Sequence, residues 1–445
     1  MESKLLRPLS QAVALALAAG GAHAAAITVT DGGDAGTAGT CTLRQAIFSA
    51  NTDSAQGTCA AGSGADTITF AAGLANSTIA LQSGQLFVTS DVTISGSGQT
   101  VTAAANSRVL VSNAIATVSI SDLTITGGNT AGAGGGIAIY GSNFTLDKVT
   151  ISGNQANALA GGLFIRGGQL SLNQSTVSGN ALTTGRGGGG IYAGGNASIT
   201  ITDATISGNS AAGGGAPRVA GGLLADNSSV TITNSTLANN IASGTSYGAG
   251  GLMSRVYGSA QTLDVYNTTI TGNSGASSNV AAGGILVGAP VGTLVATITN
   301  SIIAGNTGAT ADVSRFNNAN VIAHSDLLGT ALSATYAGNG NVFSDAPGLG
   351  VLANNGGPTL TMLPQAGSPA LGAGNAALVP SGVTTDQRGA GFPRVTNGVL
   401  DIGAVQATVA PIVPPTPTPA LSRWAMLALA GLLGLFGLRK RRRTG

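Results

Sequence analysis

The middle of the chain alternates short runs of Val, Ile, Leu and Thr with Gly, Asn and Ser, a pattern typical of short strands joined by turns. No stretch between Thr28 and Pro411 keeps the 3.6-residue apolar period of a helix. One phrase, a β-branched run that ends in Asn, recurs every 25 to 33 residues. Its copies close at Asn129, Asn154, Asn180, Asn209, Asn240, Asn273 and Asn306. Such a period predicts one supersecondary unit stacked many times.

Three short strands fit into each repeat, so the sequence predicts an all-β fold, a right-handed parallel β-helix with three strands per coil and a short N-terminal cap. Stacked coils about 4.8 Å apart would build one continuous core. A column of Asn and Asp is expected at the turn after the second strand, because these side chains tolerate left-handed backbone. Its expected members are Asp122, Asp147, Asn173, Asp203, Asn234, Asn267 and Asn300.

The N-terminus has the features of a secretory signal peptide over residues 1–24. Lys4 and Arg7 precede an apolar run at 12–20, and the Ala-x-Ala site predicts cleavage after Ala24. The alternative, a transmembrane anchor, is disfavoured because the apolar run is too short to span a bilayer. The chain is therefore expected to be exported.

The C-terminus has the features of a sorting signal. A Pro-rich spacer at 411–420 leads into residues 421–445, which hold a short apolar stretch at 425–438 and a basic block at 439–443. Fourteen apolar residues reach about 21 Å as a helix, short of a bilayer core, and the basic block would stay cytoplasmic. Transient contact with the inner membrane is expected, with a plain membrane tail as the alternative.

Residues 418–424 resemble the Ile-Pro-Thr-Leu-Ser-x-Trp tail of bacterial proteins that exosortase-type transpeptidases process. The matching residues are Pro419, Leu421, Ser422 and Trp424, whereas Thr418, Ala420 and Arg423 depart from the usual residues. The resemblance implies an exosortase-type sorting peptidase as a partner. It also implies a final location at the cell surface, in the outer membrane or outside the cell, of a Gram-negative bacterium.

Cys41 and Cys59 are the only cysteines of this exported chain, so a disulfide is expected. A metal pair and a reactive thiol are the alternatives. The segment 41–47 resembles the Cys-Ser-Leu-Arg-Glu-Ala motif found at the N-terminus of exported bacterial β-helix proteins of the pectin-lyase-like type. Residues 43–49 could form an amphipathic helix over the open end of the solenoid. These features divide the chain into a cap at 25–65 and repeats at 66–302.

The region 303–410 resembles a domain called choice-of-anchor Q, which precedes varied anchoring tails. The matching phrases begin at Asp345, Asn355, Gly367, Asp386 and Asp401. The order of this region and the tail agrees with that resemblance. Local pairing of Asp386 with Arg388 is expected to be structural.

Charge and composition exclude several kinds of site. Residues 25–422 hold ten Arg or Lys residues and 15 Asp, a net charge of −5, which offers no electrostatic footprint for nucleic acid. The same residues hold no Glu and one histidine, His324, so a His-rich metal site is excluded and a Ser-His-Asp triad has one candidate. No metal or cofactor is expected, with calcium kept as a weak alternative.

An enzyme of the polysaccharide lyase or glycoside hydrolase class is the alternative function. Its best carboxylate pair is Asp122 with Asp147, which would lie about 5 Å apart if they held equivalent positions on adjacent coils. That separation suits a retaining glycosidase or a calcium bridge. Most members of the column are Asn, however, which favours a turn ladder over a catalytic site.

A binding surface is the favoured function. The second residue after each glycine pair forms an apolar and aromatic row, and a second row follows two places later. If these rows face outward they form a contact stripe, and the alternative is that the apolar row points inward or lies under a loop. The candidate ligand-binding residues are Phe164, Tyr192, Tyr140, Arg166 and Arg255. Loops of variable length after each Asn are a further expected contact region. The chain is therefore expected to be a structural or adhesive surface protein, an adhesin that binds a glycan, a matrix or another cell.

Overall fold

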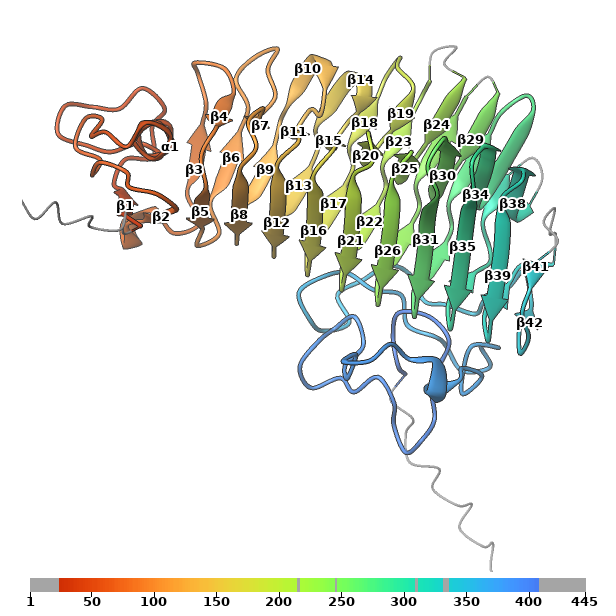
Figure 1. Cartoon of the computed structure of the whole chain (residues 1–445). Coiled ribbons are helices and arrows are strands. Elements are labelled where there is room, and N and C mark those ends of the chain that lie inside the picture. The colour runs from red at the N-terminus through yellow and green to blue at the C-terminus, as the bar shows by residue number, and fades with distance from the viewer. Residues whose placement is uncertain (1–23, 214–216, 245, 309–310, 331–335, 408–445) are drawn as a thin grey trace, which may run out of the picture. The chain divides into compact units, whose positions relative to one another are not determined.

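The computed structural model describes residues 24–213, 217–244, 246–308, 311–330 and 336–407, and residues 24–406 belong to one compact unit (Figure 1). They form a parallel β-solenoid of about nine turns with three sheets, as the repeats predicted. The handedness of the solenoid and the domain boundaries stay predictions. The signal peptide up to His23 and the sorting tail lie outside the described residues, and Ala24 is exposed.

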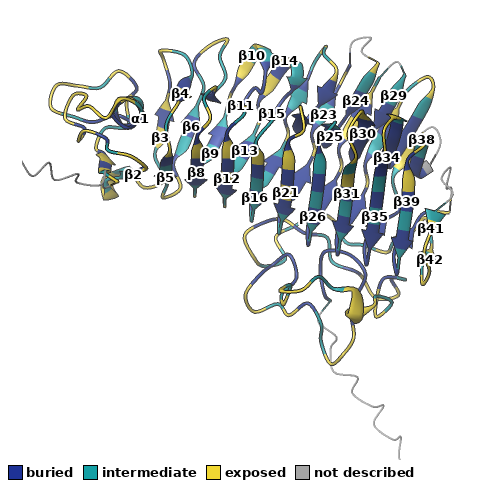
Figure 2. Ribbon diagram, in the orientation of Figure 1, coloured by how far each residue is buried: buried dark blue, intermediate teal, exposed yellow. Residues whose placement is uncertain are grey.

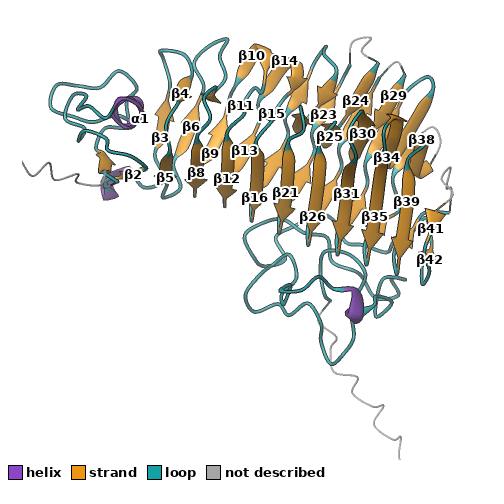
Figure 3. Ribbon diagram, viewed as in Figure 1, coloured by secondary structure: helices purple, strands orange, loops and turns teal. Residues whose placement is uncertain are grey.

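Each coil contributes one strand to each of two simple sheets, whose strands pair in parallel (Figure 3). The 12-stranded sheet contains β1 (Ala26–Val29), β2 (Asp66–Phe70), β5 (Val92–Ser95), β8 (Thr117–Ser121), β12 (Asn143–Asp147), β16 (Gln169–Asn173), β21 (Ser198–Thr202), β26 (Ser229–Thr233), β31 (Gln261–Tyr266), β35 (Leu294–Thr299), β39 (Asn320–His324) and β41 (Tyr336–Ala337). The 11-stranded sheet contains β3 (Thr78–Ala80), β6 (Thr100–Thr102), β9 (Thr124–Thr126), β13 (Thr150–Ser152), β17 (Thr176–Ser178), β22 (Thr205–Ser207), β27 (Thr236–Ala238), β32 (Thr269–Thr271), β36 (Ile302–Ile303), β40 (Leu327–Leu328) and β42 (Val342–Phe343).

The third sheet has 19 strands because the chain contributes to it both before and after each glycine pair. Its inner strands face the main core: β4 (Leu86–Val88), β7 (Leu110–Ser112), β11 (Ile137–Tyr140), β15 (Leu163–Arg166), β20 (Ile191–Gly194), β25 (Leu223–Asp226), β30 (Leu252–Tyr257), β34 (Val280–Val291) and β38 (Ala311–Asn317). The other strands form what we call the outer layer: β10 (Asn129–Ala133), β14 (Gln155–Ala160), β18 (Ala181–Leu182), β19 (Gly187–Gly188), β23 (Ser210–Ala211), β24 (Arg218–Ala220), β28 (Ile241–Ser243), β29 (Tyr247–Ala249), β33 (Ser274–Ala276) and β37 (Thr307–Gly308).

The outer layer covers the outward side of the inner strands and encloses a second hydrophobic cluster. Ala160, Ala220 and Ala249 from the outer layer pack there with outward residues of the inner strands such as Phe164 and Leu224. The main core is a separate cluster formed by the alternate, inward residues. Figure 2 shows that buried residues dominate the strands, while exposed residues gather in the loops.

From Asn154 onward, the repeated asparagine of each coil forms a continuous hydrogen-bonded ladder, whereas the first copy, Asn129, is exposed. The Asn180 side-chain oxygen accepts from the backbone N–H and the side-chain amide of Asn154, at 3.0 Å each. Asn209, Asn240, Asn273 and Asn306 repeat the arrangement, and Asp312 accepts the last pair of bonds. The amides from Asn154 to Asn273 are buried and Asn306 is half-buried, so each one satisfies polar groups that would otherwise be unpaired.

The glycine pairs of the repeat make room for this ladder. A Cβ on Gly162 would lie 2.9 Å from the Asn180 side chain and 2.7 Å from the Gly190 carbonyl oxygen. The Asn and the glycine pair are therefore two parts of one packing unit, which explains why they recur in phase.

The expected turn column of Asn and Asp is wrong by one residue in two coils. Left-handed backbone occurs at Asp122, Lys148, Gln174, Asp203, Asn234, Asn267 and Asn300. Asp147 and Asn173 instead end their strands, and Asp147 pairs with Ser121 and Asn173. Asp122 and Asp147 therefore do not hold equivalent positions.

The N-terminal cap is confirmed. Helix α1 (Leu43–Thr52) begins with a capping box between Thr42 and Gln45, and its apolar face joins the main core. The expected helix over 43–49 is three residues longer in the structure. Cys41 and Cys59 form the expected disulfide.

After β42 the chain turns back along the solenoid. Residues 346–406, called the return segment below, contain only a short 3₁₀ helix η2 (Ala376–Leu378) and isolated bridges. In Figure 1 the segment lies beside the ends of strands β21 to β35. Asp386 and Arg388 form a buried ion pair within it. No helix among the described residues is long and apolar enough to cross a membrane.

Replacing Asn209 by Ala should destabilise the solenoid by about 3 kcal/mol, because four ladder bonds are lost and buried partners stay unpaired. The measurement is the urea midpoint followed by circular dichroism. Asn157→Ala is the control, since Asn157 is exposed and its side chain bonds only to Thr183 among the described residues. Equal midpoints for the two variants would contradict the role of the ladder.

Asp203 should make the stability of the protein depend on pH. Burial raises its pKa to about 6, so the folded state binds a proton more tightly than the unfolded state, and stability falls as pH rises from about 4 to about 6. Asp203→Asn should raise the melting temperature at pH 7.5 and leave it nearly unchanged at pH 4. An equal shift at both pH values would contradict the assignment.

Candidate functional site

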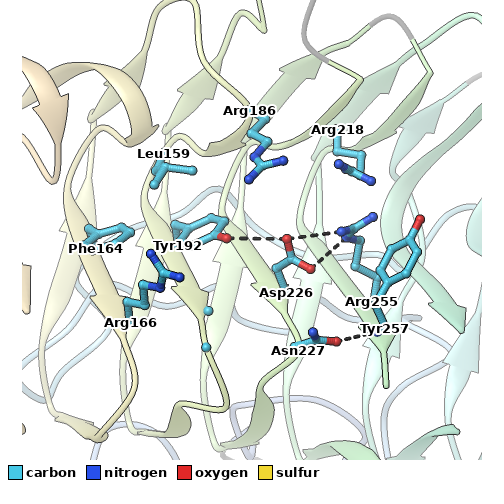
Figure 4. Close-up of a pocket in the computed structure, with 12 residues that line it drawn as sticks. Leu159, Phe164, Arg166, Arg186, Tyr192, Arg218, Asp226, Asn227, Arg255 and Tyr257 are labelled. Carbon is cyan, nitrogen blue, oxygen red and sulfur yellow. Dashed lines mark hydrogen bonds and ion pairs between the residues drawn. The ribbon is translucent and has the colours of Figure 1, made fainter. Parts of the chain in front are cut away.

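A groove of about 560 Å³ runs along the 19-stranded sheet between the inner strands and the outer layer (Figure 4). Its lining residues are Leu159, Phe164, Arg166, Arg186, Tyr192, Gly194, Gly195, Arg218, Asp226, Asn227, Arg255 and Tyr257. Four of these are arginines and one is an aspartate, on a body whose net charge is −5. The groove is therefore a local concentration of positive charge.

The floor of the groove comes from four consecutive inner strands in register. Arg166 of β15 pairs with Gly194 of β20, Gly194 with Asp226 of β25, and Asp226 with Arg255 of β30. Three coil steps of about 4.8 Å place Arg166 and Arg255 about 14 Å apart along the solenoid. Gly194 is required here, because a Cβ would lie 2.8 Å from the Tyr192 ring.

The opposite wall comes from the outer layer. Leu159 lies on β14, Arg186 precedes β19 and Arg218 begins β24. Figure 4 shows the side chains of Arg186 and Arg218 on the same side of the groove, above the floor. The floor and this wall therefore bring together residues that are up to 98 positions apart in sequence, from 159 to 257.

One end of the floor is an internally satisfied cluster. Arg255 donates to both carboxylate oxygens of Asp226, at 2.9 and 3.2 Å, and its guanidinium lies 4.3 Å from the Tyr257 ring centroid. The Tyr192 hydroxyl donates to Asp226 at 3.4 Å. Burial, and then the charge of Asp226, raises the pKa of Tyr192 to about 12. The cluster is therefore compact, and the charges of Arg255 and Asp226 offset each other.

The side chains of the other three arginines of the groove are available to bind an anion. Among the described residues, Arg166, Arg186 and Arg218 make no hydrogen bond or ion pair through their side chains. Arg166 and Arg186 are exposed, and Arg218 is half-buried. Burial, and then the nearby charge of Arg255, lowers the pKa of Arg218. An anion in the groove would relieve this repulsion.

The structure brings four of the five predicted binding residues to this groove. Arg166 and Arg255 line its floor, while Phe164 and Tyr192 are only 2% and 7% exposed, which is the alternative of an apolar row covered by a loop. Their rings stack at 5.6 Å beneath the outer layer. Tyr140 is 38% exposed and its ring lies 5.1 Å from Phe164, beside the lining residues.

Sequence reasoning missed Arg186, Arg218, Asn227 and Tyr257. The first two belong to the variable loops after Asn180 and Asn209, which were expected to carry contacts. No sequence signal indicates that these loops fold back over the inner strands.

The alternative catalytic pair gains no support from its surroundings. Asp147 accepts a hydrogen bond from the Asn173 side chain, and Asp122 lies one position out of register with it. Among the described residues, a single carboxylate lines the groove, whereas a glycosidase of the usual kind needs two. In the part of the chain that the structure describes, no three His, Cys, Asp or Glu residues lie close enough to hold a metal ion.

Comparison with protein families gives one match, the IPTL-CTERM motif over residues 416–443. The matched residues include Pro419, Leu421, Ser422 and Trp424, which lie outside the described residues. Comparison with curated proteins gives no match. The chain is thus a parallel β-solenoid with the sorting tail of an exported protein that is attached to the cell surface after processing of the exosortase kind.

Proposed function

We propose that this surface-attached solenoid is a binding protein that holds an acidic glycan in the arginine groove. The observation that carries the proposal is the set of three unpartnered arginines, Arg166, Arg186 and Arg218, around an already neutralised Asp226–Arg255 pair. Guanidinium groups bind carboxylate and sulfate groups through two parallel hydrogen bonds, so the groove suits a ligand with several such groups.

A glycan fits the groove better than a nucleic acid does. The protein body is acidic, so a polyanion is attracted only within the groove, which disfavours a nucleic acid, whose affinity rests on many phosphate contacts. The groove is about 14 Å long on its floor, which suits a short stretch of an extended chain. Tyr257 and Tyr140, at the two ends, are 44% and 38% exposed and offer aromatic surface to sugar rings. Such binding would give the protein its adhesive role.

Binding without turnover is favoured over the polysaccharide lyase or glycoside hydrolase alternative. A tyrosine acting as a general base needs a lowered pKa, and that of Tyr192 is raised. Asp226 is held by Arg255 and Tyr192, so its carboxylate is not free to act as an acid or a nucleophile.

Binding of a hexamer of galacturonic acid and of a heparin hexasaccharide should be measured by titration calorimetry. We expect at least one to bind, its methyl-esterified or desulfated form not to bind, and the affinity to fall with added salt. Arg166→Ala, Arg186→Ala and Arg218→Ala should each weaken binding about tenfold, since a charged hydrogen bond contributes about 1.5 kcal/mol.

Arg315→Ala is the matched control, because Arg315 lies on β38 and donates to the Ala319 carbonyl oxygen, away from the lining residues. An equal affinity in all four variants, or no binding of either acidic probe, would contradict the proposal. New reducing ends or unsaturated products would instead support the enzyme alternative.

A further inference from the structure

The return segment attaches to the side of the solenoid at four successive coils. At the first coil, the Thr205 hydroxyl donates to the Leu360 carbonyl oxygen at 2.6 Å, and the Gln387 side-chain amide donates to the Ala204 carbonyl oxygen at 3.1 Å. At the second, the Thr236 hydroxyl donates to the Gln387 side-chain oxygen at 2.6 Å. Gln387 is fully buried, and its side chain bonds to two coils at once.

The third and fourth coils are held in the same way. The Ala404 backbone N–H donates to the Thr269 hydroxyl at 3.0 Å. Asn300 binds the backbone of Asn375 on both sides, since its amide donates to the carbonyl oxygen at 3.0 Å and its oxygen accepts from the N–H at 2.8 Å. Ile302 and Ile402 add apolar contact in a cluster separate from the main core.

The end of the return segment, where the chain continues to the sorting tail, is also fixed. Gln406 donates from its backbone N–H to Asp386 at 2.8 Å, and its carbonyl oxygen accepts from Arg388 at 2.7 Å. Asp386 and Arg388 are buried and form an ion pair at 2.7 Å, directly beside Gln387 in sequence. A pull on residue 407 therefore reaches the coils directly through Ala404, which bonds to Thr269, and also through Asp386, Gln387 and Arg388.

The simplest path for an anchoring pull would run directly into the last coil of the solenoid. Each coil of a solenoid contacts only its neighbours, so a pull on the last coil would peel the coils one at a time. The last strand, β42, has two residues, Val342–Phe343, and would resist such a pull poorly. The return segment leads the chain away from β42 to coils in the middle of the solenoid.

We propose that the return segment is a mechanical clamp that spreads the pull of the surface anchor over four coils and protects the last coil from peeling. The proposal rests on the sorting tail and not on the arginine groove, so each can fail without the other. The return segment has no regular strands, so this function depends on its side-chain contacts.

Single-molecule force spectroscopy on residues 25–407, with handles at both ends and the disulfide oxidised, tests this function. The first rupture should release the whole return segment, about 61 residues or about 200 Å of extended chain. Release of the return segment in separate steps, or at a lower force than the coils that follow it, would contradict the clamp.

Asn300→Gly should lower the force of the first rupture, because it removes both side-chain bonds to Asn375 and keeps a residue suited to the left-handed backbone at φ 51°. Asn267→Gly is the matched control. Asn267 has the same conformation at φ 48° on the preceding coil, and both polar atoms of its buried side chain have no hydrogen-bond partner among the described residues. Equal rupture forces for the two variants would overturn the proposal.

Gln387→Ala is the second variant, with Gln365→Ala as its control, because the Gln365 amide bonds only to Leu363 within the described segment. A lowered rupture force for Gln387→Ala alone is expected. If Gln387→Ala fails to fold, as judged by circular dichroism, the Asn300→Gly comparison decides.

Discussion

The solenoid depends on one buried interaction, the amide ladder that joins Asn154 to Asn306 and ends at Asp312. Each side-chain oxygen accepts two hydrogen bonds from the coil before it, so the register of successive coils is fixed at this corner. The glycine pairs leave space beside the ladder. Since the chain enters the outer layer directly after each ladder residue, the ladder also fixes where that layer begins.

The outer layer creates the arginine groove on the otherwise regular surface of the inner strands. It buries the stacked rings of Phe164 and Tyr192, for which the sequence left both an outward and a covered position open, and it brings Arg186 and Arg218 over the floor. The coils thus supply a regular row of positions at a spacing of about 4.8 Å, and the variable loops supply the chemistry above it. A groove built this way can change its specificity through its loops while the coils stay the same.

The sequence predicted the features that recur from repeat to repeat, and it missed those that depend on the fold of a single loop. The repeat of Asn and Gly indicated the fold, because backbone pairing recurs in every coil and ladder packing recurs in the coils from Asn154 to Asn306. Arg166 and Arg255 were predicted because they lie at a fixed distance from a glycine pair. Arg186 and Arg218 were missed because the fold of a variable loop depends on contacts that no period records. The misplacement of Asp147 has a similar cause, since a one-residue shift at a turn leaves the repeat length almost unchanged.

A crystal structure with a bound acidic hexasaccharide would show whether the arginine groove recognises an acidic glycan. Sugar density is expected along the floor from Arg166 to Arg255, with acidic groups facing Arg166, Arg186 and Arg218 and with the Asp226–Arg255 pair intact. Sugar bound elsewhere on the solenoid, or bound in the groove with its acidic groups turned to solvent, would contradict this recognition.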